Sequence, residues 1–486
     1  MSREAATIQA LSARYGPRYR WLLLISVMVG TMASIMSSTI INVAIPGLSQ
    51  HFSLGQARVQ WVSSGFMVAM TVAMLTTPWL LSRYGYRATY LGTMVLLMAG
   101  GIVGGLAGQF PVVLAARVAE GLAAGAVQPI PAVIMMRAFE PSEQGKASGL
   151  FGMGVVLAPA IGPTIGGVLV DLFGWRSIFF MVVPFCIASI LLALKYVPIN
   201  APGGAAAERG ARLDWRGLAL GAGGTLCLLN GLVDLHGGSL VQAGLLLIAA
   251  GAALFTFIWW QRRMEATGRE PLMNLRLFTH RAFAMGSIVS FIYGIALFGS
   301  TYLLPVFMQL GLKLSASHVG TILLPAGLAL AFTIPAVARY TNRVPTYVLV
   351  GTGLAMLAAS FALMATVGLA APLFLLGIWA VLGRIGLGFI VPSLNLGSLR
   401  ALDKDLVSHG SSAINFMRML GGAAGVSLCG IVLEWRISAH GDSLALPGTG
   451  PARLAAFHES FFFLAAVCCL ALVAAWQLRP ARKAQV

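Results

Sequence analysis

The chain has 486 residues, of which 58% are hydrophobic and only 10% are charged, and its formal net charge is +17. Because soluble domains carry about 25% charged residues, this composition excludes a soluble globular protein. The basic residues are distributed between long apolar segments rather than gathered into one patch. That distribution argues against nucleic-acid binding and is typical of a protein that crosses a membrane many times.

Fourteen apolar segments are long enough to cross a bilayer, since a helix needs about 20 apolar residues to do so. The first segment, residues 21–45, is longer than the apolar core of a signal peptide and is predicted to be retained. The predicted spans are residues 21–45, 58–81, 88–108, 112–136, 147–170, 177–197, 216–235, 239–260, 282–305, 317–339, 346–368, 372–399, 410–434 and 459–478.

The basic residues orient these spans. Of the 32 Lys and Arg residues, three lie within spans, five lie in connections assigned to the outside, and the other 24 lie on the cytoplasmic side. The positive-inside rule therefore favours fourteen spans with both termini in the cytoplasm. The predicted organisation is a cytoplasmic N-terminus (1–20), a six-helix half (21–197), a cytoplasmic linker (198–215), two extra helices (216–260), a cytoplasmic amphipathic segment (261–281), a second six-helix half (282–478) and a cytoplasmic tail (479–486).

The fifth span contains an unusual run of prolines and glycines, residues 158–167 (APAIGPTIGG). Proline removes a backbone hydrogen bond and glycine loosens a helical turn, and in lipid this cost is tolerable only where other helices or water cover the freed carbonyls. Small residues also let two helices approach closely. We therefore predict a conformational hinge, which favours a transporter. The hinge residues are Pro159, Gly162, Pro163, Gly166 and Gly167.

Several motifs follow one another along the spans. The first span carries residues 38–46 (STIINVAIP), the loop after the second span reads 78–87 (PWLLSRYGYR), and the fourth span holds 117–121 (RVAEG). The hinge stretch is followed by 174–176 (GWR), and the thirteenth span contributes 415–422 (NFMRMLGG). In this order the motifs resemble those of the major facilitator superfamily, and more narrowly its fourteen-span drug:proton antiporter family, which performs multidrug efflux.

The resemblance implies an all-α integral membrane protein with the major facilitator fold, two six-helix halves plus two extra central helices. It also implies export of amphipathic drugs or toxic small molecules across the inner (plasma) membrane by proton antiport, without a cofactor. The implied partners are the small-molecule substrate, protons and the lipid bilayer, and some relatives also work with a periplasmic adaptor and an outer-membrane channel. In the loop motif, Arg83, Gly85 and Arg87 match the family pattern.

The sequence departs from the family pattern at two acidic positions. The family places an acid just before the Ser-Thr pair of the first span, and here that position is Ser37. The loop motif of the family opens with glycine and carries an Asp before its Arg, and here these positions are Pro78 and Ser82. The ion pair with which that Asp helps to close the cytoplasmic side is therefore not expected in its usual form.

Glu120 is the only one of the fifteen acidic residues that lies deep in a predicted span. Arg117 precedes it by three positions and so lies on the same helix face. Burial favours the protonated form of a carboxyl group and a neighbouring cation favours its ionised form, so a small rearrangement can load or release a proton. We predict that Arg117 and Glu120 couple transport to protons. The alternative is a fixed ion pair that fastens the fourth span to the first or the fifth.

Other intramembrane groups are candidates for substrate binding, because an apolar pocket with a few polar groups suits amphipathic ligands. Arg418 in the thirteenth span either balances an acid, touches an anionic substrate, or bonds carbonyls of a kinked neighbour. Arg384 is a weaker candidate of the same kind. The predicted substrate-binding residues are Asn42, Gln128, Tyr293, Tyr302, Asn395, Asn415 and Arg418.

Two other functions remain open at this stage. An uncoupled exporter, or an exporter of lipids or metabolites, would tolerate Ser37 and Ser82 without compensation. A membrane sensor or scaffold would keep the fold without transporting anything. The sequence has no Walker A loop, no His/Cys cluster with metal-ligand spacing and no nucleophile elbow, so we expect neither an ATP-driven pump nor a metal site nor an enzyme.

Overall fold

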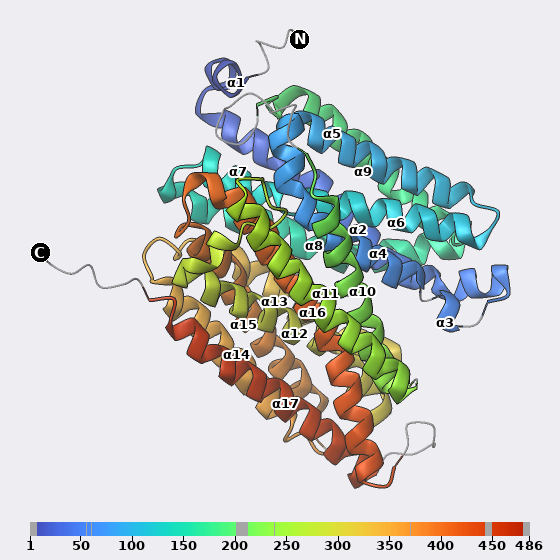
Figure 1. Cartoon of the computed structure of the whole chain (residues 1–486). Helices are drawn as coiled ribbons and strands as arrows, with labels where there is room; N and C mark the ends of the chain where they lie inside the picture. Colours follow the sequence, from blue (N-terminus) through green and yellow to red (C-terminus); the bar gives the residue numbers. More distant parts are fainter. Residues whose placement is uncertain are drawn as a thin grey trace, which may run out of the picture. The chain divides into compact units, whose positions relative to one another are not determined.

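The structure is a computed structural model that describes residues 7–54, 56–59, 61–200, 212–237, 239–369, 371–442 and 450–479. Every regular element in these ranges is helical (Figure 1). Several helices exceed 25 residues, as the long uninterrupted apolar segments of the sequence predict.

The chain forms two compact units. Unit 1 comprises residues Met1–Ala222, Phe257–Leu275 and Asp403–Phe416, and unit 2 comprises Gly223–Thr256, Arg276–Leu402 and Met417–Val486. The first nine helices belong to unit 1: α1 (Ile8–Tyr15), α2 (Tyr19–Phe52), α3 (Gln56–Val59), α4 (Trp61–Ala73), α5 (Thr77–Leu106), α6 (Phe110–Val127), α7 (Ile130–Ala138), α8 (Pro141–Phe173) and α9 (Ser177–Tyr196).

The remaining helices are α10 (Trp215–Gly237), α11 (Leu240–Ala266), α12 (Arg281–Val306), α13 (Ala316–Ala338), α14 (Thr346–Met364), α15 (Leu373–Leu399), α16 (Val407–Ala439) and α17 (Pro451–Trp476). Unit 2 contains all of α12, α13, α14, α15 and α17, whereas α10, α11 and α16 each contribute residues to both units.

Twelve helical segments among the described residues are long and apolar enough to span a membrane. One of them, Trp61–Leu106, runs through both the second and the third predicted spans. The fifth predicted span falls on α8, in which the side chains of residues 159–164 are outside the described set. The chain is therefore an all-helical, multi-pass membrane protein.

The helix boundaries differ from the predicted ones at prolines and at the polar ends of helices. The span predicted at 112–136 is divided into α6 and α7, because Pro129 and Pro131 lack the backbone N–H groups that a continuous helix needs. Helix α2, in contrast, is continuous. It has 34 residues and is about 51 Å long, well beyond a hydrocarbon core of about 30 Å.

In unit 1, α6 lies directly on α4 because glycines face that helix. A Cβ atom at Gly121 would come within 2.4 Å of the Phe66 carbonyl oxygen, and one at Gly125 within 2.1 Å of the Met70 carbonyl oxygen. No other residue leaves room for this approach. The contact brings the face of α6 that carries Arg117 against α4.

Unit 2 contains a similar contact between α12 and α16. A Cβ atom at Gly294 would lie 2.1 Å from the Arg418 carbonyl oxygen, and one at Gly421 would lie 2.0 Å from the Phe291 carbonyl oxygen. The backbones of these two helices therefore touch at the level of Arg418.

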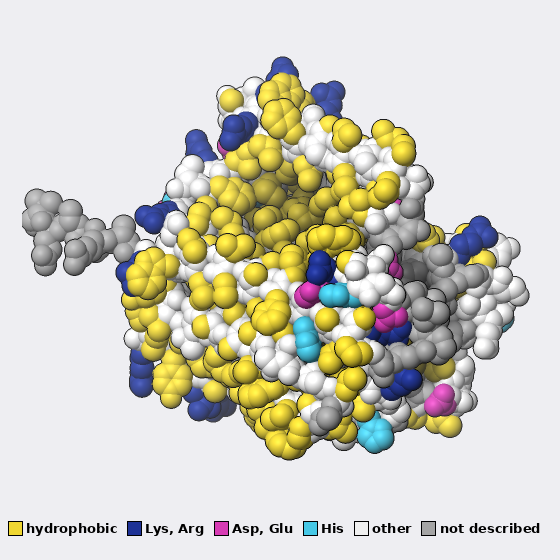
Figure 2. Space-filling view, turned by 90° about the horizontal axis from the view of Figure 1, so that it is seen from below, with side chains coloured by type: hydrophobic (Ala, Val, Ile, Leu, Met, Phe, Trp, Pro, Cys, Tyr) yellow, Lys and Arg dark blue, Asp and Glu magenta, His cyan; other side chains and the backbone are white. Residues whose placement is uncertain are grey.

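Hydrophobic side chains cover much of the surface seen in Figure 2, as expected where helices face lipid. Helix α11 is a clear case, since Ile248 is 72% exposed and Phe255 is 74% exposed. Helix α11 also runs to Ala266, beyond the predicted end of its span at residue 260, and the segment that follows contains a short 3₁₀ helix at Leu275–Thr279.

Candidate functional site

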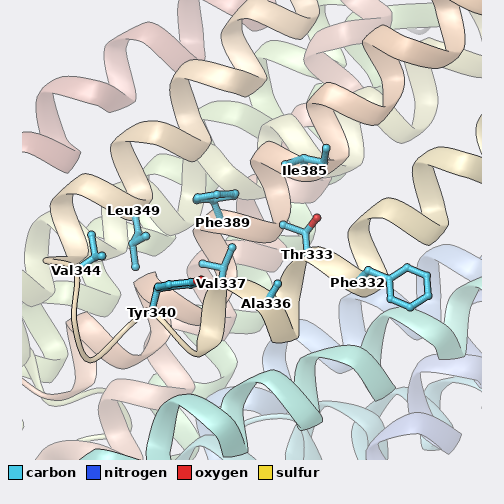
Figure 3. A pocket seen from close by; sticks show the side chains of 9 residues that line it. All are labelled: Phe332, Thr333, Ala336, Val337, Tyr340, Val344, Leu349, Ile385 and Phe389. Atoms are coloured by element: carbon cyan, nitrogen blue, oxygen red, sulfur yellow. The ribbon is translucent and has the colours of Figure 1, made fainter.

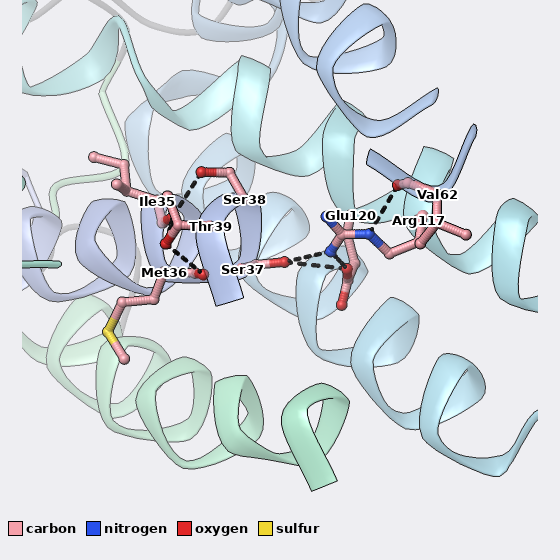
Figure 4. A network of polar contacts seen from close by, with 8 residues as sticks. All are labelled: Ile35, Met36, Ser37, Ser38, Thr39, Val62, Arg117 and Glu120. Atoms are coloured by element: carbon pink, nitrogen blue, oxygen red, sulfur yellow. Dashed lines mark hydrogen bonds and ion pairs between the residues drawn. The ribbon is translucent and has the colours of Figure 1, made fainter. Parts of the chain in front are cut away.

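A buried polar network joins α2, α4 and α6 inside unit 1 (Figure 4). Arg117 and Glu120 lie one helical turn apart on α6, and each is only 1% exposed. Ser37 reaches them from α2 and is also 1% exposed. The neighbouring hydroxyl groups of Ser38 and Thr39 instead donate to carbonyl oxygens of their own helix.

The Ser37 hydroxyl group links the two charged side chains. It accepts a hydrogen bond from Arg117 Nη1 at 2.8 Å and donates one to Glu120 Oε2 at 3.1 Å. Arg117 Nη1 also forms an ion pair with Glu120 Oε2. Helix α4 completes the cradle, since Arg117 Nε donates to the Val62 carbonyl oxygen at 3.3 Å and the Phe66 ring centroid lies 4.2 Å from Arg117 Cζ.

Helix α5 closes the remaining side of Glu120 with two glycines. A Cβ atom at Gly100 would lie 2.6 Å from Glu120 Cγ, and one at Gly101 would lie 3.6 Å from Glu120 Oε1. The carboxyl group is therefore enclosed by helix backbone, and even an alanine at position 100 would displace it.

Two polar atoms of this network have no hydrogen-bond partner among the described residues, Glu120 Oε1 and Arg117 Nη2. Burying such atoms unpaired costs about 1–3 kcal/mol each, and more when the group is charged. One oxygen of the carboxyl group thus remains available to take up a proton while the other is bound by Arg117 and Ser37.

The loop motif after the second predicted span is bound to the segment that directly follows α9. The backbone N–H groups of Tyr86 and Arg87 donate to the carbonyl oxygens of Asn200 and Pro198 at 3.0 and 2.9 Å. Arg87 Nε donates to the Val197 carbonyl oxygen at 2.7 Å. Arg83 stacks on aromatic rings instead, with its Cζ 5.5 Å from the Tyr84 ring centroid.

Gly85 makes this contact possible, and we expect Gly85→Ala to destabilise the protein. Its φ of 75° and ψ of 177° fall in a region that only glycine occupies readily, at a cost to other residues of about 1–3 kcal/mol. A Cβ atom there would also lie 2.3 Å from the Ile199 carbonyl oxygen. The thermal unfolding midpoint of the purified protein should fall clearly below that of the wild type.

Gly92→Ala is the matched control, because Gly92 lies on the same helix and a Cβ atom there meets nothing within 4 Å. Equal midpoints for the two variants would show that the backbone conformation at Gly85 is not required.

The predicted hinge lies on α8, which is a single helix from Pro141 to Phe173. The side chains of Pro159, Gly162 and Pro163 are outside the described residues. A Cβ atom at Gly166 would lie 2.5 Å from Ile40 Cγ1 on α2, whereas one at Gly167 would meet nothing within 4 Å. Gly166 thus serves close packing of α8 on α2, and the hinge stays a prediction.

The predicted substrate-binding residues are divided between the two units. In unit 1, the Gln128 amide donates to Met70 Sδ at 3.8 Å, and the Asn415 amide donates to the Ser411 carbonyl oxygen at 2.8 Å. The Ser411 hydroxyl group donates to the carbonyl oxygen of Pro129, so the start of α16 lies beside the junction of α6 and α7. The side chain of Asn42 is outside the described residues.

The other predicted binding residues lie in unit 2. Tyr293 is 4% exposed, whereas Tyr302, Asn395 and Arg418 are partly exposed. The two tyrosines are nine positions apart on α12, and at about 100° per residue they project from opposite faces of that helix. They therefore do not face one common surface.

Unit 2 also has an open apolar groove of about 430 Å³ between α13, α14 and α15 (Figure 3). Of its nine lining side chains only Thr333 and Tyr340 carry a polar group, and none of the predicted site residues lines it. The lining residues are Phe332, Thr333, Ala336, Val337, Tyr340, Val344, Leu349, Ile385 and Phe389.

Several members of the buried network were not predicted. Ser37 stands out in the sequence only as a missing acid, and its bonds to Arg117 and Glu120 bridge 80 and 83 positions. Nothing in the local sequence marks Val62, Phe66 and Gly100 as members of this network, since apolar residues and glycines in a membrane-spanning segment can have many other roles.

The fold and the site together define a class. Long apolar helices in two compact units, with an enclosed ion pair inside one of them, are the architecture of a membrane transporter rather than of a single-span receptor.

The family follows from comparison with known proteins. The profile of the Major Facilitator Superfamily matches residues 27–426, and the chain belongs to that family. It is 28% identical to the MFS-type transporter YcnB of Bacillus subtilis, over 91% of each chain. It is also 28% identical to a multidrug resistance protein B homolog of Mycobacterium tuberculosis (89% of this chain and 81% of the relative), and 25% identical to the lincomycin resistance protein LmrB of Listeria monocytogenes (94% and 96%).

Solved structures show the same fold at low identity. The human organic anion transporter MFSD10 superposes with a TM-score of 0.66 at 16% identity, over 94% of this chain and 99% of its own. The proton:xylose symporter XylE superposes with a TM-score of 0.66 at 13% identity, over 96% and 97%. The major facilitator fold is thereby established for this chain.

Proposed function

We propose that this transporter exports amphipathic compounds in exchange for protons, and that Glu120 carries the proton. The observation that carries the proposal is the hydrogen bond between Ser37 and Glu120. Ser37 occupies the position at which the drug:proton antiporters have their first-span acid, and here a carboxyl group reaches the same place from α6. The missing acid is thus replaced by one on a neighbouring helix.

The network can hold Arg117 in either protonation state of Glu120. When Glu120 is ionised, Arg117 pairs with it and with the Ser37 hydroxyl group. When Glu120 is protonated, the Val62 carbonyl oxygen and the Phe66 ring still contact the guanidinium group. Protonation therefore loosens the tie between α6 and α2 and leaves the Arg117 guanidinium group without a carboxylate to balance its charge, and this cost favours a rearrangement.

Alternating exposure of a central site would then complete the cycle, with the two six-helix halves moving against each other. Exchange of one entering proton for a neutral substrate moves one charge, which is worth about 2.3 kcal/mol per 100 mV. Since about 1.4 kcal/mol corresponds to a tenfold concentration ratio, a membrane potential of about 100 mV alone supports a substrate concentration gradient of roughly fortyfold.

The names of the relatives support the export of drugs, since they include multidrug and lincomycin resistance proteins. With this function we propose fourteen spans, both termini in the cytoplasm and residence in the inner (plasma) membrane. The basic residues on the cytoplasmic side of the predicted spans support this topology. A periplasmic adaptor and an outer-membrane channel remain candidate partners.

The decisive experiment measures accumulation of a panel of dyes and antibiotics in a strain that lacks its own efflux pumps. Cells with the protein should accumulate less of at least one compound, and an uncoupler should abolish the difference. A difference that survives the uncoupler would show export without proton coupling, and no difference for any compound would contradict drug export.

A further inference from the structure

The open groove of unit 2 follows the last turns of α13 (Figure 3). Tyr340 and Val344 lie at one end of the groove and Phe332 lies at the other. Eight positions separate Phe332 from Tyr340, which at 1.5 Å per helical residue corresponds to about 12 Å. Since half of the hydrocarbon core is about 15 Å thick, the groove is long enough to extend over most of one leaflet.

The lining of the groove suits a hydrocarbon chain. Phe332 is 72% exposed and Tyr340 is 53% exposed, so both rings are open to an apolar partner. Tyrosine is enriched where a membrane meets water, which indicates that the Tyr340 end lies at the level of the lipid headgroups. Phe332 then lies among the acyl chains. A volume of about 430 Å³ with almost only apolar side chains around it fits part of a lipid tail.

Two arginines lie at the Tyr340 end of the groove. Arg339 and Arg343 directly precede the lining residues Tyr340 and Val344, and both arginines are exposed. The turn that carries them is folded back on the end of α13, because the backbone N–H groups of Arg343 and Val344 donate to the Tyr340 carbonyl oxygen at 2.9 and 2.8 Å. Both arginines are therefore held beside the mouth of the groove.

A third arginine reaches the same turn from α15. Arg400 Nη2 donates to Asn342 Oδ1 at 2.7 Å, and Asn342 directly precedes Arg343. The sequence from Arg276 to Leu402, which covers α12, α13, α14 and α15, contains no Asp or Glu. These helices therefore place basic residues and no acidic residue at this end of the groove, and the charge there complements an anion.

We propose that the groove binds an acyl chain of an anionic phospholipid whose phosphate group lies against Arg339 and Arg343. The chain matches the apolar lining, and basic pockets between membrane helices are known to bind anionic headgroups. In the proposed topology this end of α13 is cytoplasmic, the side on which anionic lipids create a negative surface potential. The occupant is a lipid and not the exported compound, so this proposal does not depend on drug export.

Photolabelling of the purified full chain in nanodiscs tests the proposal. The probes are phosphatidylglycerol and phosphatidylcholine with the same diazirine-bearing acyl chain, each added in the same small amount to phosphatidylcholine nanodiscs. Both leaflets contain the probe, so the result is independent of the topology. One basic residue near a membrane surface favours an anionic lipid about fivefold, and phosphatidylglycerol should therefore label peptides that line the groove at least about fivefold more than phosphatidylcholine does.

Four variants separate the headgroup from the chain. Arg339→Gln/Arg343→Gln should lose most of the preference for phosphatidylglycerol. Lys313→Gln is its control and should keep the preference, because Lys313 is exposed and lies before the opposite end of α13. Ala336→Phe fills the groove and should reduce its labelling severalfold. Leu328→Phe should not, since Leu328 is exposed on α13 outside the groove.

Labelling of α11, where Ile248 is 72% exposed, should be the same in every variant and shows that each is folded in the bilayer. Equal labelling of the groove by the two probes would overturn the proposal, as would a preference that the double arginine variant retains. Absence of groove labelling would overturn it as well, and dimers in the nanodisc would then assign the groove to a second copy of the chain.

Discussion

Glu120→Gln is expected to abolish proton-driven efflux while leaving the protein in the membrane. Glutamine has nearly the same shape and can still accept hydrogen bonds from Ser37 and Arg117, so the contacts around α6 are kept, although the unbalanced charge of Arg117 makes this variant less stable than the wild type. It cannot bind and release a proton. Glu120 is the only acid deep in a span, so no other group of this depth can replace it.

The measurement records internal pH in proteoliposomes when substrate is added, together with the amount of protein in the membrane. The wild type should move protons on addition of substrate, and Glu120→Gln should not. Glu140→Gln is the control, since Glu140 lies at the exposed start of α8 and its removal should leave coupling intact. Unchanged proton movement in Glu120→Gln would remove Glu120 from the mechanism.

A second substitution makes the test sharper. Ser37 Oγ lies 2.8 Å from Arg117 Nη1, so an acid at position 37 would meet the same guanidinium group. Ser37→Asp combined with Glu120→Gln should recover part of the coupling that Glu120→Gln loses. A purely structural role of Glu120 would give no such recovery of proton movement.

The second large effect is expected for Arg117→Gln, which leaves a carboxyl group enclosed without its cation. Breaking a buried pair by removing one partner typically costs about 3–5 kcal/mol, and Arg117 also loses its contacts with Val62 and Phe66. The variant should therefore reach the membrane in much smaller amounts and unfold at a lower temperature than the wild type.

The double variant Arg117→Gln/Glu120→Gln separates the two contributions. Removal of both charges leaves no uncompensated carboxylate, so it should be more stable than Arg117→Gln alone. Arg176→Gln serves as a control, because Arg176 stacks on Trp175 and donates to the Ala107 carbonyl oxygen at 3.2 Å rather than contacting an enclosed carboxylate. If the double variant is no more stable than the single one, the pair contributes little electrostatic energy.

The positions of the spanning helices could be predicted from the sequence because hydropathy is a local property. Most predicted spans fall on one helix, from residues 21–45 on α2 to 459–478 on α17, whereas residues 58–81 are divided among α3, α4, a 3₁₀ turn and the start of α5. The break between α6 and α7 was not predicted. In a uniformly apolar segment hydropathy does not change at a break, and Pro129 and Pro131 alone do not distinguish a kink from a helix end.

In the candidate site, only the contacts within a single helix could be predicted from the sequence. Arg117 and Glu120 are neighbours by helical spacing alone. Their contact with Ser37 depends on the orientation of α2 and α6 about their own axes. Apolar periodicity indicates that orientation only weakly, because lipid and the protein interior are both apolar. The predicted binding residues show the same limit, since they are distributed over two units and Tyr293 and Tyr302 face opposite ways.

The hydrogen bond between Ser37 and Glu120 also has an evolutionary consequence. An acid at position 37 and an acid at position 120 would sit side by side, share one proton and both face Arg117. An ancestor with both acids would therefore be tolerated, and loss of either one would leave a working protonation site. If Glu120 carries the proton as proposed, a coupling carboxylate could pass from one helix to the other through single substitutions. Its position in space would then be kept while its position in the sequence changes.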